Sequence, residues 1–281
     1  MQKWTHPKMQ ALAFVVTTFL ISWTEQYFII KGDGIQNSTR AFALMWTPGL
    51  VGLFYSLFFD RNFKALGIKL PNIKSLLIAY FIPALTAVII VGCLVMFKIT
   101  DFQINPELIE KKGGLSNFLI AALLVAPTVG MIVSFISGLG EELGWRGLLH
   151  TKLQFLNPNR RYLLTGFIWS VWHWPLIIFG DYATSDKPFL NLFFFTVAVV
   201  GLSFLMGLLR DKTGSVFPAA LVHGSHNMWI LGISPAFFKA SPLIPYFGGE
   251  SGLFCAAVYL AMAVVIYKRQ NTVSEKDSLC H

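Results

Sequence analysis

The chain has 281 residues, of which 55% are hydrophobic and only 13% are charged. About a quarter of the residues of a soluble globular domain are charged, so the composition excludes that class and indicates a polytopic membrane protein. The net charge of +8 is typical of basic loops on one side of a membrane. No nucleic-acid-binding motif accompanies this charge, so membrane lipid is an expected partner and nucleic acid is not.

Eight apolar segments follow one another, each long enough, or nearly so, to cross a bilayer. We therefore predict an all-α polytopic membrane protein, a single transmembrane domain over residues 1–281 with about eight transmembrane helices. The fourth segment is expected to continue as a helix towards Phe155. The segments are 10–30, 41–59, 75–97, 117–139, 162–179, 188–209, 216–233 and 252–267.

The loop charges predict how the chain is oriented. Most of the 22 Lys and Arg residues fall in the two termini and in the second, fourth and sixth loops. Basic loops stay on the cytoplasmic side, so the N- and C-termini are both predicted to be cytoplasmic. The expected location is the plasma (inner) membrane.

One stretch at the end of the fourth segment carries candidate chemistry. Glu141 and Glu142 are adjacent, and Arg146 follows four residues after Glu142. In a helix, Glu142 and Arg146 share a face and can form an ion pair. Glu141 is rotated by about 100° from Glu142, so its carboxylate is expected to stay free. Carboxylates at membrane depth are costly and are interpreted as functional.

Two later segments carry histidines. His173 lies about 16 Å into the fifth segment and His223 about 10 Å into the seventh, at 1.5 Å per residue from the predicted cytoplasmic ends. Both segments start on the side where the fourth one ends. Glu141, His173 and His223 are therefore predicted to line one cavity that opens to the cytoplasm.

Together with Asn227, these residues form a plausible hydrolytic set. A carboxylate beside an apolar wall can take and return a proton near neutral pH. His223 and Asn227 are four residues apart on one helix face, so both can donate to a developing oxyanion. The same side chains could instead tie helices together through buried polar contacts.

A zinc site is a second alternative, with Glu141, His173 and His223 as ligands and water in the open position. The usual H-E-x-x-H motif is absent and Asn is a poor zinc ligand, so no cofactor or metal is the main expectation. Three tryptophans, Trp145, Trp169 and Trp172, either wall an apolar substrate groove or serve as packing. His150 is expected near the interface, in contact with solvent or lipid headgroups.

The motifs resemble those of a known family. The pattern Glu141-Glu142-x-x-x-Arg146, an aromatic-x-x-x-His at Trp169 and His173, and His223-x-x-x-Asn227 are similar to the three motifs of the CPBP (Abi) family. This family includes the Ras-converting CAAX prenyl endopeptidase and bacterial relatives implicated in bacteriocin immunity. The motif-bearing core covers about 117–233.

The resemblance implies an eight-helix intramembrane glutamic endopeptidase that needs no metal. It implies that Glu141 activates water with His173, that His223 and Asn227 form the oxyanion hole, and that Glu142 and Arg146 organise the site. The family's second motif usually begins with Phe, so Trp169 is a departure that bears on substrate fit. The implied substrate is a CAAX-type or other membrane-associated peptide or membrane-anchored protein, with or without a prenyl group. The alternative is a non-proteolytic immunity or scaffold protein of the same fold.

Overall fold

The computed structural model describes residues 6–32, 34–35, 38–182 and 185–279. Across these ranges its regular elements are all helices, which confirms the all-α prediction. Among the described residues, seven helices are long and apolar enough to cross a membrane. They span Pro7–Lys31, Ser38–Asp60, Ile73–Met96, Leu115–Lys152, Pro158–Phe179, Pro188–Thr213 and Leu253–Thr272.

Several long helices are built from consecutive segments in which α-helical turns alternate with wider π-helical turns. The predicted extension of the fourth segment is confirmed, because the helix that begins at Leu115 continues to Lys152. The elements in chain order are α1 (Pro7–Lys31), α2 (Ser38–Tyr55), η2 (Ser56–Asp60), η3 (Lys64–Leu66), α3 (Ile73–Met96), α4 (Pro106–Lys111), α5 (Leu115–Ile120), η4 (Ala121–Gly130), α6 (Met131–Glu142), η5 (Leu143–Leu149), α7 (His150–Lys152), α8 (Pro158–Phe179), α9 (Pro188–Thr213), α10 (Phe217–His226), η6 (Asn227–Ile233), η7 (Ser234–Phe237), α11 (Ile244–Phe247) and α12 (Leu253–Leu279).

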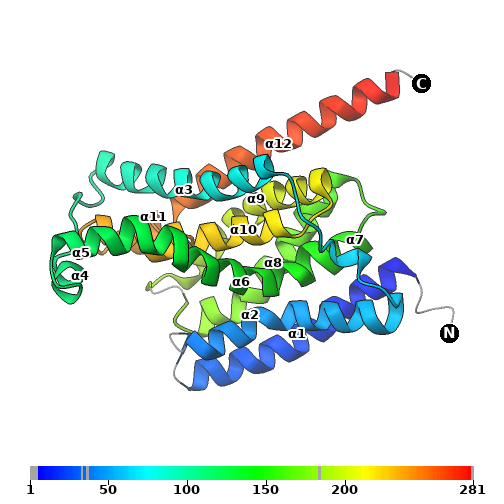
Figure 1. Cartoon of the computed structure of the whole chain (residues 1–281), viewed down its shortest axis with the longest axis horizontal. Coiled ribbons are helices and arrows are strands. Elements are labelled where there is room, and N and C mark those ends of the chain that lie inside the picture. The colour runs from blue at the N-terminus through cyan, green and yellow to red at the C-terminus, as the bar shows by residue number, and fades with distance from the viewer. Residues whose placement is uncertain (1–5, 33, 36–37, 183–184, 280–281) are drawn as a thin grey trace.

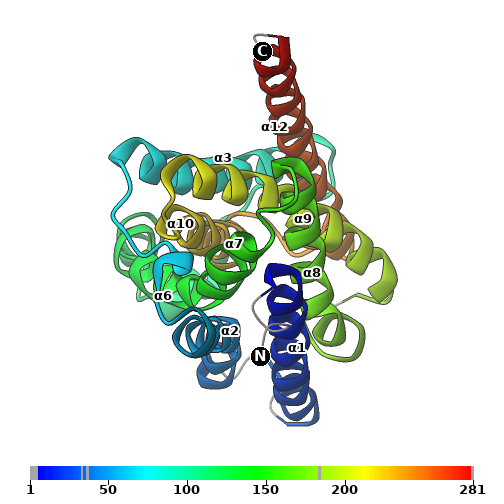
Figure 2. The same ribbon diagram turned by 90° about the vertical axis from the view of Figure 1, so that its right-hand side faces the viewer.

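The segment predicted over 216–233 differs from the other seven. It is helical, but it consists of α10 with 10 residues and η6 with 7 residues, and it is not among the helices that meet the length required to cross a bilayer alone. Its α-helical part is surrounded by protein, since α10 packs against α3, α6 and α9. The end-on view in Figure 2 shows α10 inside this ring of neighbours. A helix enclosed in this way does not have to match the thickness of the lipid.

The first helix starts, and the last one ends, at the same end of the bundle (Figure 1). An even number of passes requires this arrangement, and α10 with η6 supplies the pass that the seven long helices lack. Figure 1 also shows α1 and α2 side by side along one edge, with α4 and α5 at the end of the bundle away from the termini. Which end faces the cytoplasm stays a prediction from the loop charges.

Local sequence signals set where several helices begin. Asn157 caps α8, its side-chain oxygen accepting a hydrogen bond from the backbone N–H of Arg160 at 2.9 Å. Asn72 caps α3 in the same way through the N–H of Ser75, also at 2.9 Å. Each cap satisfies a backbone donor that the first helical turn leaves without a partner.

Glycines bring the helix that carries the two glutamates close to its neighbours. A Cβ atom added to Gly144 would lie 2.6 Å from the carbonyl oxygen of Pro48 in α2, and Gly49 of α2 touches the carbonyl of Gly140. On the other side, a Cβ at Gly224 of α10 would lie 2.7 Å from the backbone nitrogen of Phe135. Small residues at helix contacts let backbones approach closely in a membrane, where dispersion contacts drive association.

We expect Gly144→Ala to destabilise the protein, because the new methyl group would meet backbone atoms that cannot rotate away. Overpacking of this kind costs about 1–3 kcal/mol. Gly92→Ala in α3 is the matched control, since nothing lies within 4 Å of an added Cβ there. Thermal unfolding in detergent compares the two, and equal melting temperatures would contradict the close-packing account.

Candidate active site

Three helices bring the predicted site together. Glu141 comes from the end of α6, His173 from α8 and His223 from α10, which are far apart in the sequence. Glu141 is 2% exposed, His173 is 6% exposed and His223 is 4% exposed. The site is therefore enclosed by the bundle, and the opening to the cytoplasm predicted from the sequence stays a prediction.

The ion pair between Glu142 and Arg146 is confirmed. Nη1 of Arg146 lies 3.0 and 2.9 Å from the two carboxylate oxygens of Glu142, and both residues are fully buried. The spacing of four residues still closes this pair where α6 passes into the wider turns of η5. Turns of the π type occur frequently at functional sites.

His223 lies between the two glutamates. Its Nδ1 is 3.0 Å from Oε1 of Glu142, and its Nε2 is 3.9 Å from Oε1 of Glu141. A carboxylate can only accept, so Nδ1 carries the proton in the hydrogen bond to an ionised Glu142. The other ring nitrogen of His223 is then directed at Glu141.

Glu141 is not free, and that prediction was wrong. The indole N–H of Trp169 donates a hydrogen bond to Oε2 of Glu141 at 2.7 Å. The helical rotation did separate Glu141 from Arg146, as expected, but α8 supplies a donor from the other side. Sequence spacing within one helix could not find it, because the donor comes from a different helix.

Trp169 also contacts three other polar residues of the site. Its ring lies 4.4 Å from the guanidinium carbon of Arg146 and 5.2 Å from the ring of His223, measured to ring centroids. Its backbone carbonyl accepts a hydrogen bond from Nδ1 of His173 at 3.0 Å. Because a carbonyl cannot donate, Nδ1 of His173 holds the proton, and Nε2 of a neutral ring keeps its lone pair.

The other two tryptophans are buried, which favours packing, one of the two roles considered for them. Trp145 is fully buried and packs edge-on against Phe14 at 5.8 Å and Trp172 at 6.2 Å, measured between ring centroids. Trp172 is 1% exposed, and its ring is 4.6 Å from that of His173. Both side chains are core packing that supports the helices carrying the site.

Asn227 follows one turn after His223, at the start of η6. It is half-buried, and within the described ranges its side chain forms no hydrogen bond. Its side-chain amide is therefore not held by a neighbouring residue, whereas the polar groups of Glu141, His173 and His223 are.

A second carboxylate–imidazole pair was missed in the sequence. Nε2 of His226 lies 3.3 Å from Oε2 of Glu250, and its Nδ1 lies 2.9 Å from the hydroxyl of Tyr259. Burial raises the pKa of Glu250, but the hydrogen bond and charge of His226 outweigh it and hold this pKa below its ordinary value. The signal that could have found the pair is an acidic residue, Glu250, just before the last apolar segment.

His150 is buried, so the expected solvent or headgroup contact was wrong. Its Nε2 lies 2.7 Å from Oδ1 of Asp211 at the end of α9. Arg161 and Tyr162 of α8 both donate to the other oxygen of Asp211, at 2.6 and 2.5 Å. This cluster joins α7, α8 and α9 at the end of the bundle where the termini lie.

In the part of the chain that the structure describes, no three or more His, Cys, Asp and Glu side chains gather in a way that could hold a metal ion. The zinc alternative with Glu141, His173 and His223 thus has no ready-made cluster of ligands there. His223 already uses one ring nitrogen on Glu142.

The fold and the site define an integral membrane protein of helices that encloses two carboxylates and two imidazoles. Residues 115–229 match the sequence profile of a family described as type II CAAX prenyl endopeptidase Rce1-like. This part contains the three motifs, and the match confirms the resemblance drawn from them. The chain is also similar to CAAX prenyl protease 2 of Methanococcus maripaludis, with 26% identity over 251 residues that cover 79% of this chain and 83% of that protein.

We expect Arg146→Met to cost about 3–5 kcal/mol of folding free energy, because it leaves the buried carboxylate of Glu142 without its cation. The double variant Glu142→Gln/Arg146→Met removes both charges and should recover part of that loss. Denaturation of the purified variants in detergent measures the difference. A double variant no more stable than Arg146→Met would show that the pair is not coupled.

Proposed function

We propose that the chain is an intramembrane glutamic endopeptidase that cleaves CAAX-type, prenylated C-terminal peptides of membrane-anchored proteins. The match to the CAAX endopeptidase profile supports a peptide hydrolase, and the similar protein's name supports the substrate class. The observation that carries the mechanism is the buried carboxylate of Glu141, held by an N–H donor and next to an imidazole. We further propose the plasma (inner) membrane as its location.

In this mechanism Glu141 is the general base. It takes a proton from a water molecule while the water oxygen attacks the carbonyl carbon of the scissile amide, which gives a tetrahedral oxyanion. The same carboxyl then returns the proton to the leaving nitrogen as the C–N bond breaks. His173 helps to hold the water, because its Nε2 keeps a lone pair while Nδ1 donates to the carbonyl of Trp169.

His223 and Asn227 are the proposed oxyanion donors. His223 can donate through Nε2 only if both ring nitrogens carry protons, since Nδ1–H is used on Glu142. Two neighbouring carboxylates favour that charged form. Asn227, with an amide that no other described side chain holds, supplies the second donor.

Glu142 and Arg146 organise this arrangement. Arg146 fixes Glu142, and Glu142 fixes the ring of His223 through Nδ1. Neither residue has to touch the substrate. A site whose polar groups are held in place before the substrate binds stabilises charge in the transition state without reorganising.

We expect Glu141→Gln to abolish cleavage of a quenched fluorescent farnesylated peptide by the purified protein, because the amide cannot take a proton from water. General acid–base groups contribute about 10²–10⁴-fold, so residual turnover of at most a hundredth is expected. The side chain keeps its shape and an acceptor oxygen for Trp169, so folding is preserved and is checked by thermal unfolding.

A chelator added to the wild-type assay tests the zinc alternative, and a non-prenylated peptide tests the substrate class. Activity that survives the chelator supports the glutamic mechanism. Activity that is lost and then restored by zinc would overturn it, together with the oxyanion role of His223. Full cellular function of the Glu141→Gln variant would favour the non-proteolytic role instead.

Trp169→Phe is expected to lower kcat/KM by roughly tenfold, because it removes a charge-assisted hydrogen bond to Glu141 and keeps the aromatic ring. Trp172→Phe is the matched control, since its N–H has no partner within the described residues. Equal kcat/KM values for the two variants would contradict this role of Trp169.

A further inference from the structure

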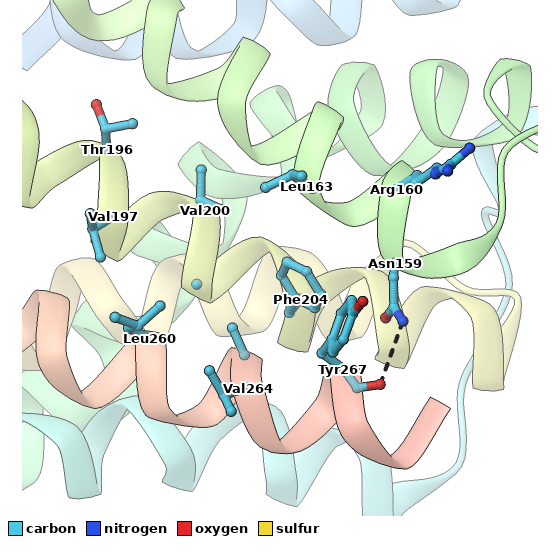
Figure 3. A pocket seen from close by; sticks show the side chains of 12 residues that line it. Asn159, Arg160, Leu163, Thr196, Val197, Val200, Phe204, Leu260, Val264 and Tyr267 are labelled. Carbon is cyan, nitrogen blue, oxygen red and sulfur yellow. Dashed lines mark hydrogen bonds between the residues drawn. The ribbon is translucent and has the colours of Figure 1, made fainter. Parts of the chain in front are cut away.

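An apolar groove runs along the outside of the bundle between α8, α9 and α12. It has a volume of about 500 Å³. Figure 3 shows its walls, with Val197 and Val200 of α9 facing Leu260 and Val264 of α12, and Leu163 of α8 above them. Both α9 and α12 are among the helices able to cross a membrane, so the groove lies at the depth of the lipid chains.

The long part of this groove offers nothing for a polar ligand to bind. Thr196 is the polar side chain along it, and its hydroxyl is already used by the carbonyl of Leu192 and the hydroxyl of Ser170, both at 2.8 Å. A hydrocarbon chain fits such a surface, because an apolar ligand has no hydrogen bonds to water that it would lose on binding.

One end of the groove is polar. Asn159 lies there, 9% exposed, and its amide nitrogen donates to Asn271 at 2.9 Å and faces the carbonyl of Tyr267 at 3.5 Å (Figure 3). Its amide oxygen is buried and has no partner among the described residues. Because a buried acceptor without a donor is costly, this oxygen marks a position for a ligand that donates a hydrogen bond.

The same end is rich in positive charge. Arg160 lines the groove beside Asn159, is exposed, and its side chain has no partner in the part of the chain that the structure describes. Lys268 and Arg269 follow Tyr267 on α12, and both are exposed. Asp211 at the end of α9 is already engaged by His150, Arg161 and Tyr162. The mouth of the groove is therefore a cationic site above an apolar channel.

We propose that this groove is a binding site for an anionic phospholipid with a hydroxylated headgroup, such as phosphatidylglycerol. The phosphate binds Arg160, a headgroup hydroxyl donates to the free oxygen of Asn159, and an acyl chain lies along Val200 and Val264. Basic pockets between membrane helices bind anionic headgroups in this way. The site is separate from the proposed catalytic groups and does not depend on their activity.

The test is native mass spectrometry of the purified, delipidated protein, titrated with dioleoyl phosphatidylglycerol or dioleoyl phosphatidylcholine. The wild type is expected to bind phosphatidylglycerol more tightly. Arg160→Ala should lower that affinity roughly tenfold and leave phosphatidylcholine unchanged, because one charge-assisted contact is lost. Val264→Trp, at a residue that is 43% exposed, should fill the groove and weaken both lipids.

Lys111→Ala is the matched control, since it removes one exposed cation from α4, at the opposite end of the bundle (Figure 1). It should bind both lipids like the wild type. Equal affinity of the wild type for the two lipids would overturn the proposal. So would an undiminished preference in Arg160→Ala, or the same loss in Lys111→Ala, which would point to attraction by overall charge. All three changes lie at exposed side chains, and thermal unfolding checks that each variant is folded.

Discussion

Two adjacent carboxylates inside an apolar bundle are the constraint on which the rest of this structure depends. Leaving an isolated charge without a partner in a low-dielectric interior costs several kcal/mol, so each carboxylate has to be matched. Arg146 matches Glu142, His223 contacts both glutamates, and Trp169 donates to Glu141. The partners come from the same helix and from two others, so the charges fix how three helices pack.

The need to give each buried carboxylate a partner explains why α6, α8 and α10 approach one another closely. The polar groups have to be kept away from lipid, and a hydrogen bond of about 3 Å between side chains of different helices leaves little room between backbones. Gly138 of α6 has the Cβ of His223 within 3.1 Å of where its own Cβ would be, and Gly224 lies against Phe135. Larger residues at these contacts would separate α6 from α10 and with them Glu142 from His223. The hydrogen bonds between the polar side chains therefore depend on the small residues that let α6 and α10 approach each other.

The inside of the bundle is polar around the site, whereas its outer surface is apolar where it faces lipid. Inside, polar side chains are joined into one network around Trp169, which holds the site in place. Outside, the surface is apolar along the lipid chains and basic at the end where Arg160 and Arg269 lie. The basic end is also where His150 and Asp211 tie α7 to α9. The basic residues from which the orientation of the chain is predicted thus lie near a structural cluster as well as near the mouth of the groove.

The sequence by itself determined the class of fold, the apolar segments and the pair between Glu142 and Arg146. These properties are local: hydropathy, helical spacing and loop charge are all read within a few turns of one segment. The three motifs also predicted the resemblance to the family whose profile residues 115–229 match.

Only the tertiary structure decided the rest. It showed that Trp169 donates to Glu141, that Trp145 and Trp172 are buried packing, and that His150 is buried against Asp211. It also enclosed α10 within the bundle. Each of these depends on which faces of separate helices meet, and the periodicity of a single segment does not contain that information, because an apolar helix in a membrane can present any face to a neighbour.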